Sequence, residues 1–406
     1  MEPLRHEVCL HHPHATREVG VPGWGGGASL PKSGGFPPKI GGRVTGGEGS
    51  GAIMRGEIAE SVSVATRLIA DRSRFEAIGA ELARRNPSVV VVAGRGTSDH
   101  AAIYARYLLE HALGVPVALA AASLLTQYGI ESASPQSALL AFSQSGAGPD
   151  MIALVESAKR RGAYSIALTN DASSGLAAAA DATAYLDAGP ERAVAATKTF
   201  LAELISVALI AAAAARAAGR DAAWASEIDA LPARMQASLD AASLWLARAT
   251  DAPILTALLS GNRALVVGRG FEYPNALEIA LKLRETTAMF ADGYSAADLL
   301  HGPIASANAE VPTIVLSTDP ATEKSISGSL ERLRAVNAPL LLVHSGATGS
   351  RGVAPHEELV LPKGASGPLC TPVTAIAGLT IIEAIATRRG FNPDAPQGLT
   401  KITKTL

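Results

Sequence analysis

The chain has 406 residues, 48% hydrophobic and 18% charged, which is enough apolar material for two domains of ordinary size. Its formal net charge is -2, and the sequence has no stripe of basic residues that could contact the phosphates of a nucleic acid. Nucleic acid is therefore not expected as a partner. The two cysteines, Cys9 and Cys370, match no zinc or redox spacing, so a reduced, cytoplasmic protein is expected.

Residues 1–53 are predicted to form a disordered tail, because glycine and proline dominate between residues 20 and 51 without apolar periodicity. Three histidines at positions 11, 12 and 14 lack a scaffold that fixes coordination geometry, so no metal site is assigned. The segment has no continuous apolar core, which argues against a signal peptide. Met54 opens the first helical pattern, and we expect it to be the natural start of the protein.

The elements from residue 54 onward alternate between helix and strand. One or two helices reach residue 85, followed by a strand at 89–93, a helix at 97–110 and a strand at 117–120. A further helix leads to a strand that ends at 142, and a helix at 149–161 leads to a strand at 165–169. A short helix and a strand near 184–186 complete this part. This alternation predicts right-handed βαβ units and a parallel sheet. A buried apolar helix at 199–218 and a helical connector at 221–248 follow. The apolar stretch 204–215 is shorter than the roughly 20 residues of a membrane span, so no membrane partner is expected.

Three apolar runs of this first part return in the same order. Residues 89–96 return at 264–270, 139–143 at 313–317 and 165–170 at 340–345, with offsets of 174, 174 and 175. Register kept across three runs indicates a duplication. The predicted fold class is therefore α/β, with two tandem domains that each hold a doubly wound parallel sheet flanked by helices. The second copy is expected over about 254–385, with a short tail after residue 390.

Two loops of the first copy place neutral hydrogen-bond donors at the carboxyl ends of strands, where doubly wound sheets bind ligands. These donors are Thr97, Ser98, Ser143, Gln144 and Ser145. Glycines beside them allow close approach of an anion, so phosphate binding is predicted, with helix capping as the alternative use of the serines. A nicotinamide cofactor is rejected, because the loop at 94–98 lacks the third glycine of a dinucleotide fingerprint.

The second copy carries groups that move protons. Glu278, Lys282 and Glu285 share one helix face, and the apolar residues between them favour a crevice wall over the alternative of a solvated ladder. His301 lies in a glycine-proline loop, where a catalytic and a structural role are equally expected. Two interpretations of Lys198 stay open: a cation at a helix start near the ligand, or a surface lysine.

With these residues, the chain resembles the tandem sugar-isomerase (SIS) family, which includes the isomerase half of glutamine–fructose-6-phosphate aminotransferase and the SIS-type glucosamine-6-phosphate deaminases. Residues 268–285 and the His-Gly-Pro motif at 301–303 carry the resemblance, which covers about residues 54–406. It implies N-terminal helices at 54–80, a phosphosugar-binding SIS domain at 81–220, a connector at 221–254, a catalytic SIS domain at 255–397 and a C-terminal tail at 398–406.

The resemblance also implies roles for single residues. Ser98, Ser143, Gln144 and Ser145 would hold the sugar phosphate with Thr97 nearby, and the backbone of Val194 would touch the sugar. Glu285 would move a proton between C1 and C2, and His301 would help to open the ring from a loop that a partner subunit can contribute. Lys401 matches a lysine that forms a Schiff base with the ketose, while Glu278 and Lys282 match positions lining the site. A homodimer with a shared active site and no cofactor or metal is expected.

Departures from the aminotransferase pattern direct the functional prediction. The aminotransferase has an N-terminal glutaminase domain with a nucleophilic cysteine, for which Cys9 has no context, so ammonia from glutamine is not expected. Residues 145–150 lack its Glu-Thr pair, whereas 149–150 and 392–396 look more like the deaminases, although Gln397 stands where an arginine is expected. We predict that glucosamine 6-phosphate and water give fructose 6-phosphate and ammonia. The alternatives are another 6-phosphosugar amine, ammonia-dependent synthesis in reverse, and a phosphosugar-sensing binding protein, which would not need Glu285, His301 and Lys401.

Overall fold

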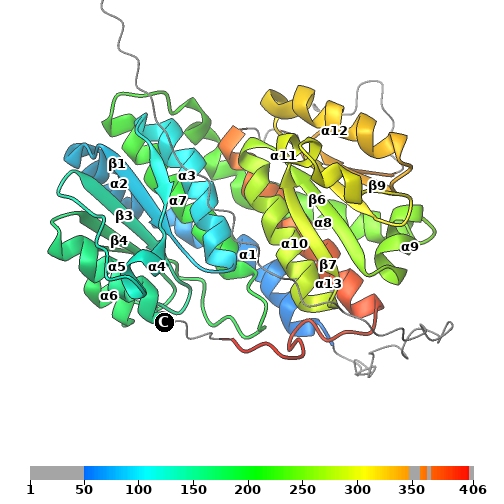
Figure 1. Ribbon diagram of the computed structural model, residues 1–406, viewed down its shortest axis with the longest axis horizontal. Coiled ribbons are helices and arrows are strands. Elements are labelled where there is room, and N and C mark those ends of the chain that lie inside the picture. Colours follow the sequence, from blue (N-terminus) through cyan, green and yellow to red (C-terminus); the bar gives the residue numbers. More distant parts are fainter. Residues whose placement is uncertain (1–49, 347–356, 364–366, 402–406) are drawn as a thin grey trace, which may run out of the picture. The chain divides into compact units, whose positions relative to one another are not determined.

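The computed structural model describes residues 50–346, 357–363 and 367–401. They contain two five-stranded parallel sheets, each flanked by helices (Figure 1). The α/β class with tandem, doubly wound domains is thereby confirmed. The predicted tail lies outside the described residues except for its last few positions, where the first helix begins at Ala52 and not at Met54.

The first sheet has the strand order β2-β1-β3-β4-β5. From β1 the chain adds β2 on one side and then returns to add β3 on the other, so the strand order reverses between β1 and β3. Buried valines and leucines fill these strands because helices cover both faces of the sheet. The elements are α1 (Ala52–Ala70), α2 (Ser73–Arg85), β1 (Val89–Ala93), α3 (Thr97–Leu113), β2 (Val117–Leu119), α4 (Ala122–Thr126), β3 (Ser137–Phe142), α5 (Pro149–Arg160), β4 (Tyr164–Thr169), α6 (Gly175–Ala179), β5 (Ala182–Tyr185) and α7 (Lys198–Ala217).

The second sheet repeats this topology as β10-β9-β8-β6-β7. The connector and second copy comprise η1 (Ala223–Ala230), α8 (Leu231–Arg248), α9 (Pro253–Ser260), β6 (Arg263–Gly268), η2 (Gly270–Glu272), α10 (Tyr273–Thr287), β7 (Phe290–Ser295), α11 (Ala296–Leu300), η3 (Pro303–Ser306), β8 (Thr313–Ser317), η4 (Pro320–Thr322), α12 (Glu323–Ala335), β9 (Leu340–His344), β10 (Glu357–Val360), η5 (Gly367–Leu369) and α13 (Cys370–Arg388). The edge strand β7 was not predicted, because its sequence Phe-Ala-Asp-Gly-Tyr-Ser carries polar residues and an exposed phenylalanine.

The first loop of each copy repeats one close approach. A Cβ at Gly94 would collide with the backbone carbonyl of Ser98, and a Cβ at Gly268 would collide with that of Glu272. Both pairs are 174 residues apart, which matches the predicted offset. Only glycine lets the strand end approach the following helical turn this closely.

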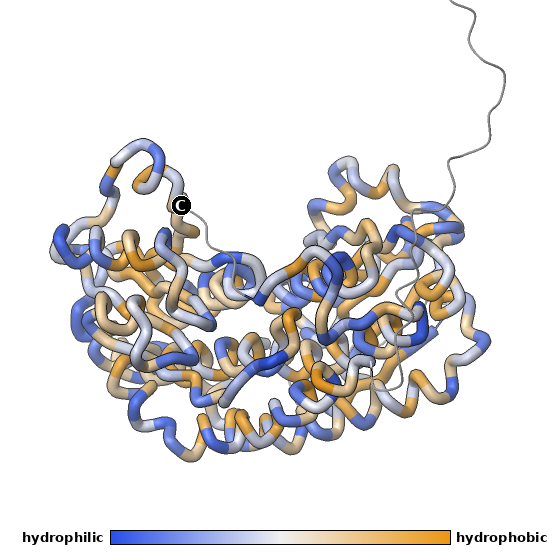
Figure 2. Tube along the Cα trace, turned by 90° about the horizontal axis from the view of Figure 1, so that it is seen from below, coloured by the Kyte–Doolittle hydropathy of each residue, from blue (hydrophilic) through white to orange (hydrophobic). Residues whose placement is uncertain are grey.

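Long helices join the two copies. Helix α1 packs against α7, α8 and α13, and the apolar core of the first copy continues onto α13. Hydrophobic residues, orange in Figure 2, concentrate in the interior strands and helices. Helix α7 and residues 367–388 have the length and composition of membrane spans, but 89% of each apolar window is buried inside the protein, as in core helices.

Candidate active site

Two loops meet at the carboxyl edge of the first sheet. Thr97 and Ser98 follow β1, and Ser143, Gln144 and Ser145 follow β3. The two strands are hydrogen-bonded neighbours in register up to their ends. All five predicted phosphate-binding residues therefore lie along one edge, where the strand order changes direction and ligands of such sheets bind.

The second of these loops, which follows β3, carries hydrogen-bond donors that are not used within the described residues. Among the described residues, the side chains of Ser143 and Gln144 have no hydrogen-bond partner, although both are half-buried. The hydroxyl of Ser145 accepts the backbone N–H two residues ahead at 3.4 Å, which leaves its own proton free. An exposed guanidinium stands nearby, since Nε of Arg95 lies 2.8 Å from Oδ2 of Asp150 at the start of α5.

The hydroxyl of Ser98 is already engaged. It donates to Oε1 of Glu203 in α7 at 2.8 Å. Glu203 is 1% exposed, and its Oε2 atom has no partner among the described residues. Burial raises the pKa of Glu203 to about 8; the Ser98 hydrogen bond opposes this rise, and the carboxylates of Glu191 and Glu278 add to it.

Two of the three charged residues on this face of α10 are buried and the third is half-buried, which excludes the solvated ladder that spacing alone left open. Glu278 and Lys282 are each 1% exposed, and the side chain of Glu285 is 24% exposed. Nζ of Lys282 lies 3.5 Å from Oε1 of Glu278 and 2.5 Å from Oε2 of Glu285. Because a buried charge requires close partners, Lys282 fixes both carboxylates.

Glu278 also contacts the first copy. Thr97 donates its hydroxyl to Oε1 at 3.1 Å, and Nδ1 of His100 lies 2.6 Å from Oε2. Burial alone would raise the pKa of Glu278, but Lys282, His100 and Thr97 hold it below its usual value. Burial opposes the charge on Lys282, yet Glu278 and Glu285 raise the pKa of this lysine. The helix with the predicted base is thus held against the loop with the predicted phosphate donors.

Lys401 reaches this region from the C-terminal segment. Its Nζ lies 2.9 Å from Oε2 of Glu191 and donates to the carbonyl of Ala193 at 2.7 Å. The next residue is Val194, whose backbone N–H donates to the carbonyl of Asp394 at 3.0 Å. The predicted residues Val194 and Lys401 are therefore brought together. Glu191 also interacts electrostatically with Lys282 and Glu203, which places all these groups in one charged region.

His301 is not part of this cluster. It is exposed at the end of α11, and within the described residues its side chain makes no hydrogen bond or ion pair. Lys198 is the first residue of α7 and is not a surface lysine, which excludes one of the two alternatives left open for it. It is buried, with Nζ 2.7 Å from Oε2 of Glu60 and 3.9 Å from Oε1 of Glu57, so it ties α7 to α1.

Comparison with known proteins identifies the family. The SIS domain pattern matches residues 84–213 and 257–359, which together make up more than half of the chain and fall in the two copies. The chain belongs to the SIS family.

Relatives extend the match over most of the chain. The glutamine–fructose-6-phosphate aminotransferase (isomerizing) of Halobacterium salinarum is 32% identical over 324 residues, which are 78% of this chain and 52% of the relative. The SIS chain thus spans about half the length of the curated relatives it matches. A proposed phosphosugar isomerase from Silicibacter pomeroyi has 29% identity and a TM-score of 0.71 over 84% of this chain and 99% of its own. The glucosamine-6-phosphate deaminase of Thermotoga maritima shares the fold, with 20% identity and a TM-score of 0.65 over 85% of this chain and all of its own.

Three residues of the candidate site were missed in the sequence. Glu203 is a single acid inside an otherwise apolar helix, and Glu191 and His100 lie close to predicted residues. An acid alone in an apolar run is a usable signal, because burying it is costly without a partner. His100 and Glu191 carry no comparable signal, since each is recognised only by what it contacts.

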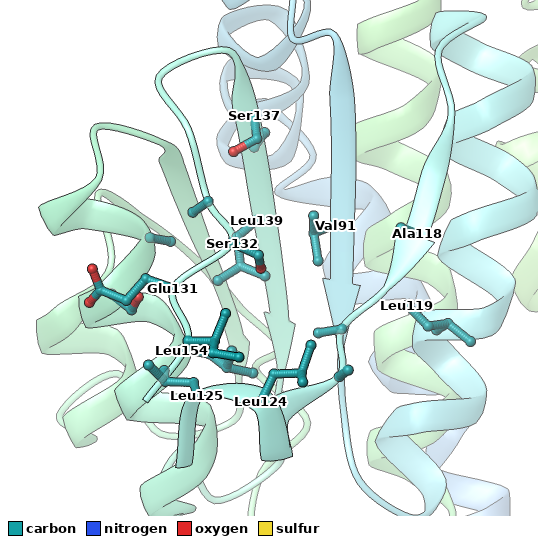
Figure 3. Close-up of a pocket in the computed structure, with 17 residues that line it drawn as sticks. Val91, Ala118, Leu119, Leu124, Leu125, Glu131, Ser132, Ser137, Leu139 and Leu154 are labelled. Atoms are coloured by element: carbon teal, nitrogen blue, oxygen red, sulfur yellow. The ribbon is translucent and has the colours of Figure 1, made fainter. Parts of the chain in front are cut away.

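An apolar cavity of about 240 Å³ lies elsewhere, on the face of the first sheet that packs against α5. Val91, Leu139 and Leu154 line it together with Leu124 (Figure 3). None of the predicted site residues lines this cavity, and the carboxylate in its lining, Glu131, is paired with Arg160 at 2.7 Å. The candidate site is therefore the charged region between the SIS domains.

Proposed function

We propose that this SIS protein converts glucosamine 6-phosphate and water to fructose 6-phosphate and ammonia. The observation that carries the proposal is the buried pair Glu278 and Lys282 with the half-buried Glu285 beside it, held against the hydroxyl-bearing residues of the first SIS domain. A base fixed beside a phosphate-binding loop is what proton transfer between neighbouring carbons of a phosphosugar needs. The names of the relatives, a fructose-6-phosphate aminotransferase and a proposed phosphosugar isomerase, point to the same substrate class.

The phosphate would bind Ser143, Gln144 and Ser145, whose donors are free or partly free. Binding energy at the phosphate, remote from the reacting carbons, then serves to position C1 and C2. His301 opens the pyranose ring, and Glu285 takes the proton from C2. The same carboxyl group returns the proton to C1, while O1 gains a proton and the C2 amine loses one, which leaves an imine at C2 that water hydrolyses to the ketone with release of ammonia.

Lysines on both sides of the site would support this chemistry. Lys282 fixes the orientation of Glu285 through their 2.5 Å ion pair. Nζ of Lys401 is paired with the carboxylate of Glu191 at 2.9 Å, and a lysine in this position could stabilise negative charge on the enolamine. Its Schiff base with the ketose would first require transfer of its proton to another group.

We further propose that the protein acts as a homodimer in which His301 completes the site of the partner subunit. His301 is exposed, and its side chain makes no hydrogen bond or ion pair within the described residues, which supports this arrangement. Residues 149–150 and 392–396 support the deaminase direction, because they look more like the deaminases than the aminotransferase.

The test is release of ammonia and fructose 6-phosphate from glucosamine 6-phosphate, with galactosamine 6-phosphate in parallel. Glu285→Gln should abolish release and retain binding, whereas Glu310→Gln, an exposed glutamate of the same domain, should behave like the wild type. Binding of both sugars without release from either would contradict the deaminase and favour a phosphosugar sensor. Release that persists in Glu285→Gln would show that another group is the base.

A further inference from the structure

Glu203 in the first SIS domain and Glu272 in the second are both buried carboxylates, but their hydrogen-bonding capacity is satisfied differently. In the second domain Glu272 precedes α10, and Thr374 of α13 donates to it at 2.7 Å. In the first domain the partners are exchanged, since the hydroxyl donor Ser98 lies in the first turn of α3 and the acid Glu203 lies on α7. Because of this exchange, the acid of the first domain lies on α7, and the serine that it contacts belongs to the predicted phosphate-binding residues.

Glu272 has a complete set of donors. Thr318 and Thr374 donate to Oε1, and the amide of Asn275 donates to Oε2 at 2.7 Å. The carboxyl group of Glu272 therefore has a structural role, because both of its oxygens accept hydrogen bonds from within the domain.

Glu203 has only one donor, the hydroxyl of Ser98, and a buried Oε2 atom without a partner among the described residues. The charged groups facing it come from several elements. Glu191, paired with Lys401, approaches from the loop before α7, and Glu278, paired with Lys282 and His100, approaches from α10. An unpaired carboxylate beside two other carboxylates is costly to ionise, so a proton on Glu203 is the favoured state.

We propose that Glu203 is a positioning residue whose proton frees the hydroxyl of Ser98 to donate to the substrate phosphate, so that binding of a 6-phosphosugar takes up a proton. This inference rests on the proposed function. A serine hydroxyl has one proton to donate. If Glu203 is ionised, Ser98 donates its proton to Oε1 of Glu203. The substrate phosphate then faces only the lone pairs of the serine oxygen, next to a negative charge. If Glu203 is protonated, it donates to Oγ of Ser98, and the serine proton turns to a phosphate oxygen.

The expected size follows from simple titration. With its pKa at about 8, the protonated fraction of Glu203 falls about tenfold between pH 7 and pH 9. A phosphate monoester is already a dianion across this range, since its second pKa is about 6. The affinity for the sugar phosphate should therefore fall about tenfold, and binding at pH 8 should take up about half a proton.

The experiment is calorimetric titration of the full chain with fructose 6-phosphate at pH 7, 8 and 9, in two buffers of different ionisation enthalpy. Glu203→Gln, whose amide donates permanently to Ser98, should bind with an affinity that changes less than about twofold across this range. Ser98→Ala should bind weakly at every pH. Glu272→Gln, the equally buried carboxylate of the second domain, is the matched control and should keep the tenfold change.

An equal pH dependence in wild type and Glu203→Gln would overturn the inference, as would the absence of proton uptake by the wild type. The proton count needs no variant, so it decides the matter even if Glu203→Gln fails to fold. Absence of binding by every protein at every pH would instead overturn the proposed function, and this inference with it.

Discussion

Oε2 of Glu278, in the second SIS domain, lies 2.6 Å from Nδ1 of His100, in the first. Both side chains are almost fully buried, so the contact joins the domains where water has little access. Lys282 and Glu285 follow Glu278 on the same helix, and their placement depends on this contact. The proposed base is therefore positioned in part by a residue of the other domain.

Replacing His100 should slow turnover more than it weakens binding. His100→Ala leaves a buried carboxylate short of one donor, which costs about 1–3 kcal/mol and lowers kcat about tenfold or more if α10 shifts. His100→Asn should restore part of the rate through its amide donor. His111→Ala, at the exposed end of the same helix, should have no effect. A change confined to KM would contradict a positioning role.

Asp394 should matter for stability and for activity. Its carboxylate accepts the backbone N–H groups of Gly51, Ile53 and Met54 at 2.8–3.3 Å, and so caps α1. Asp394→Ala should lower the free energy of unfolding by about 1–2 kcal/mol in urea titration. It should also lower kcat, because Lys401 lies on the same segment. Asp251→Ala, an exposed aspartate, serves as control, and equal stability of the two variants would refute the cap.

The pH dependence of stability should reveal the proton on Glu203. Its pKa of about 8 in the folded protein lies above the ordinary 4.5, so its stabilising contribution is complete below pH 4.5 and declines as pH rises through 8. Between pH 5 and pH 9 this decline amounts to about 4 kcal/mol. Glu203→Gln removes the titrating group, so it should gain stability over the wild type as pH rises. Thermal unfolding at several pH values checks this, and parallel curves would exclude the raised pKa.

Mixed subunits should test the shared site. Glu285→Gln and His301→Ala should each be inactive as homodimers. If His301 serves the partner's site, a co-expressed mixture holds half heterodimers, each with one intact site, and recovers about a quarter of the wild-type activity. If both residues serve the same subunit, the mixture stays inactive. A monomeric, fully active protein would contradict the shared site altogether.

The sheets, the duplication and the row on α10 were predictable because each leaves a periodic trace in the sequence. Buried strands are continuous apolar runs, and Glu278, Lys282 and Glu285 follow helical spacing. Strand β7 left no such trace, since polar residues interrupt an exposed edge.

The partners of the site residues were not predictable in the same way. Ser98 and Glu203 are 105 residues apart, and His100 and Glu278 are 178 apart. Such pairs are set by how two sheets and their helices pack, which no local pattern encodes. The predicted roles of the site residues, and the domain boundaries, remain proposals that the variants above address.

The cap on α1 has a consequence for synthesis in the cell. Asp394 lies 340 residues after Met54, so α1 leaves the ribosome long before the segment that completes its N-terminus. Each sheet can form earlier, as domains generally fold as units during translation. A polypeptide that stops short of Asp394 would then hold two folded sheets with an open helix α1, so truncated products would be exposed to proteolysis.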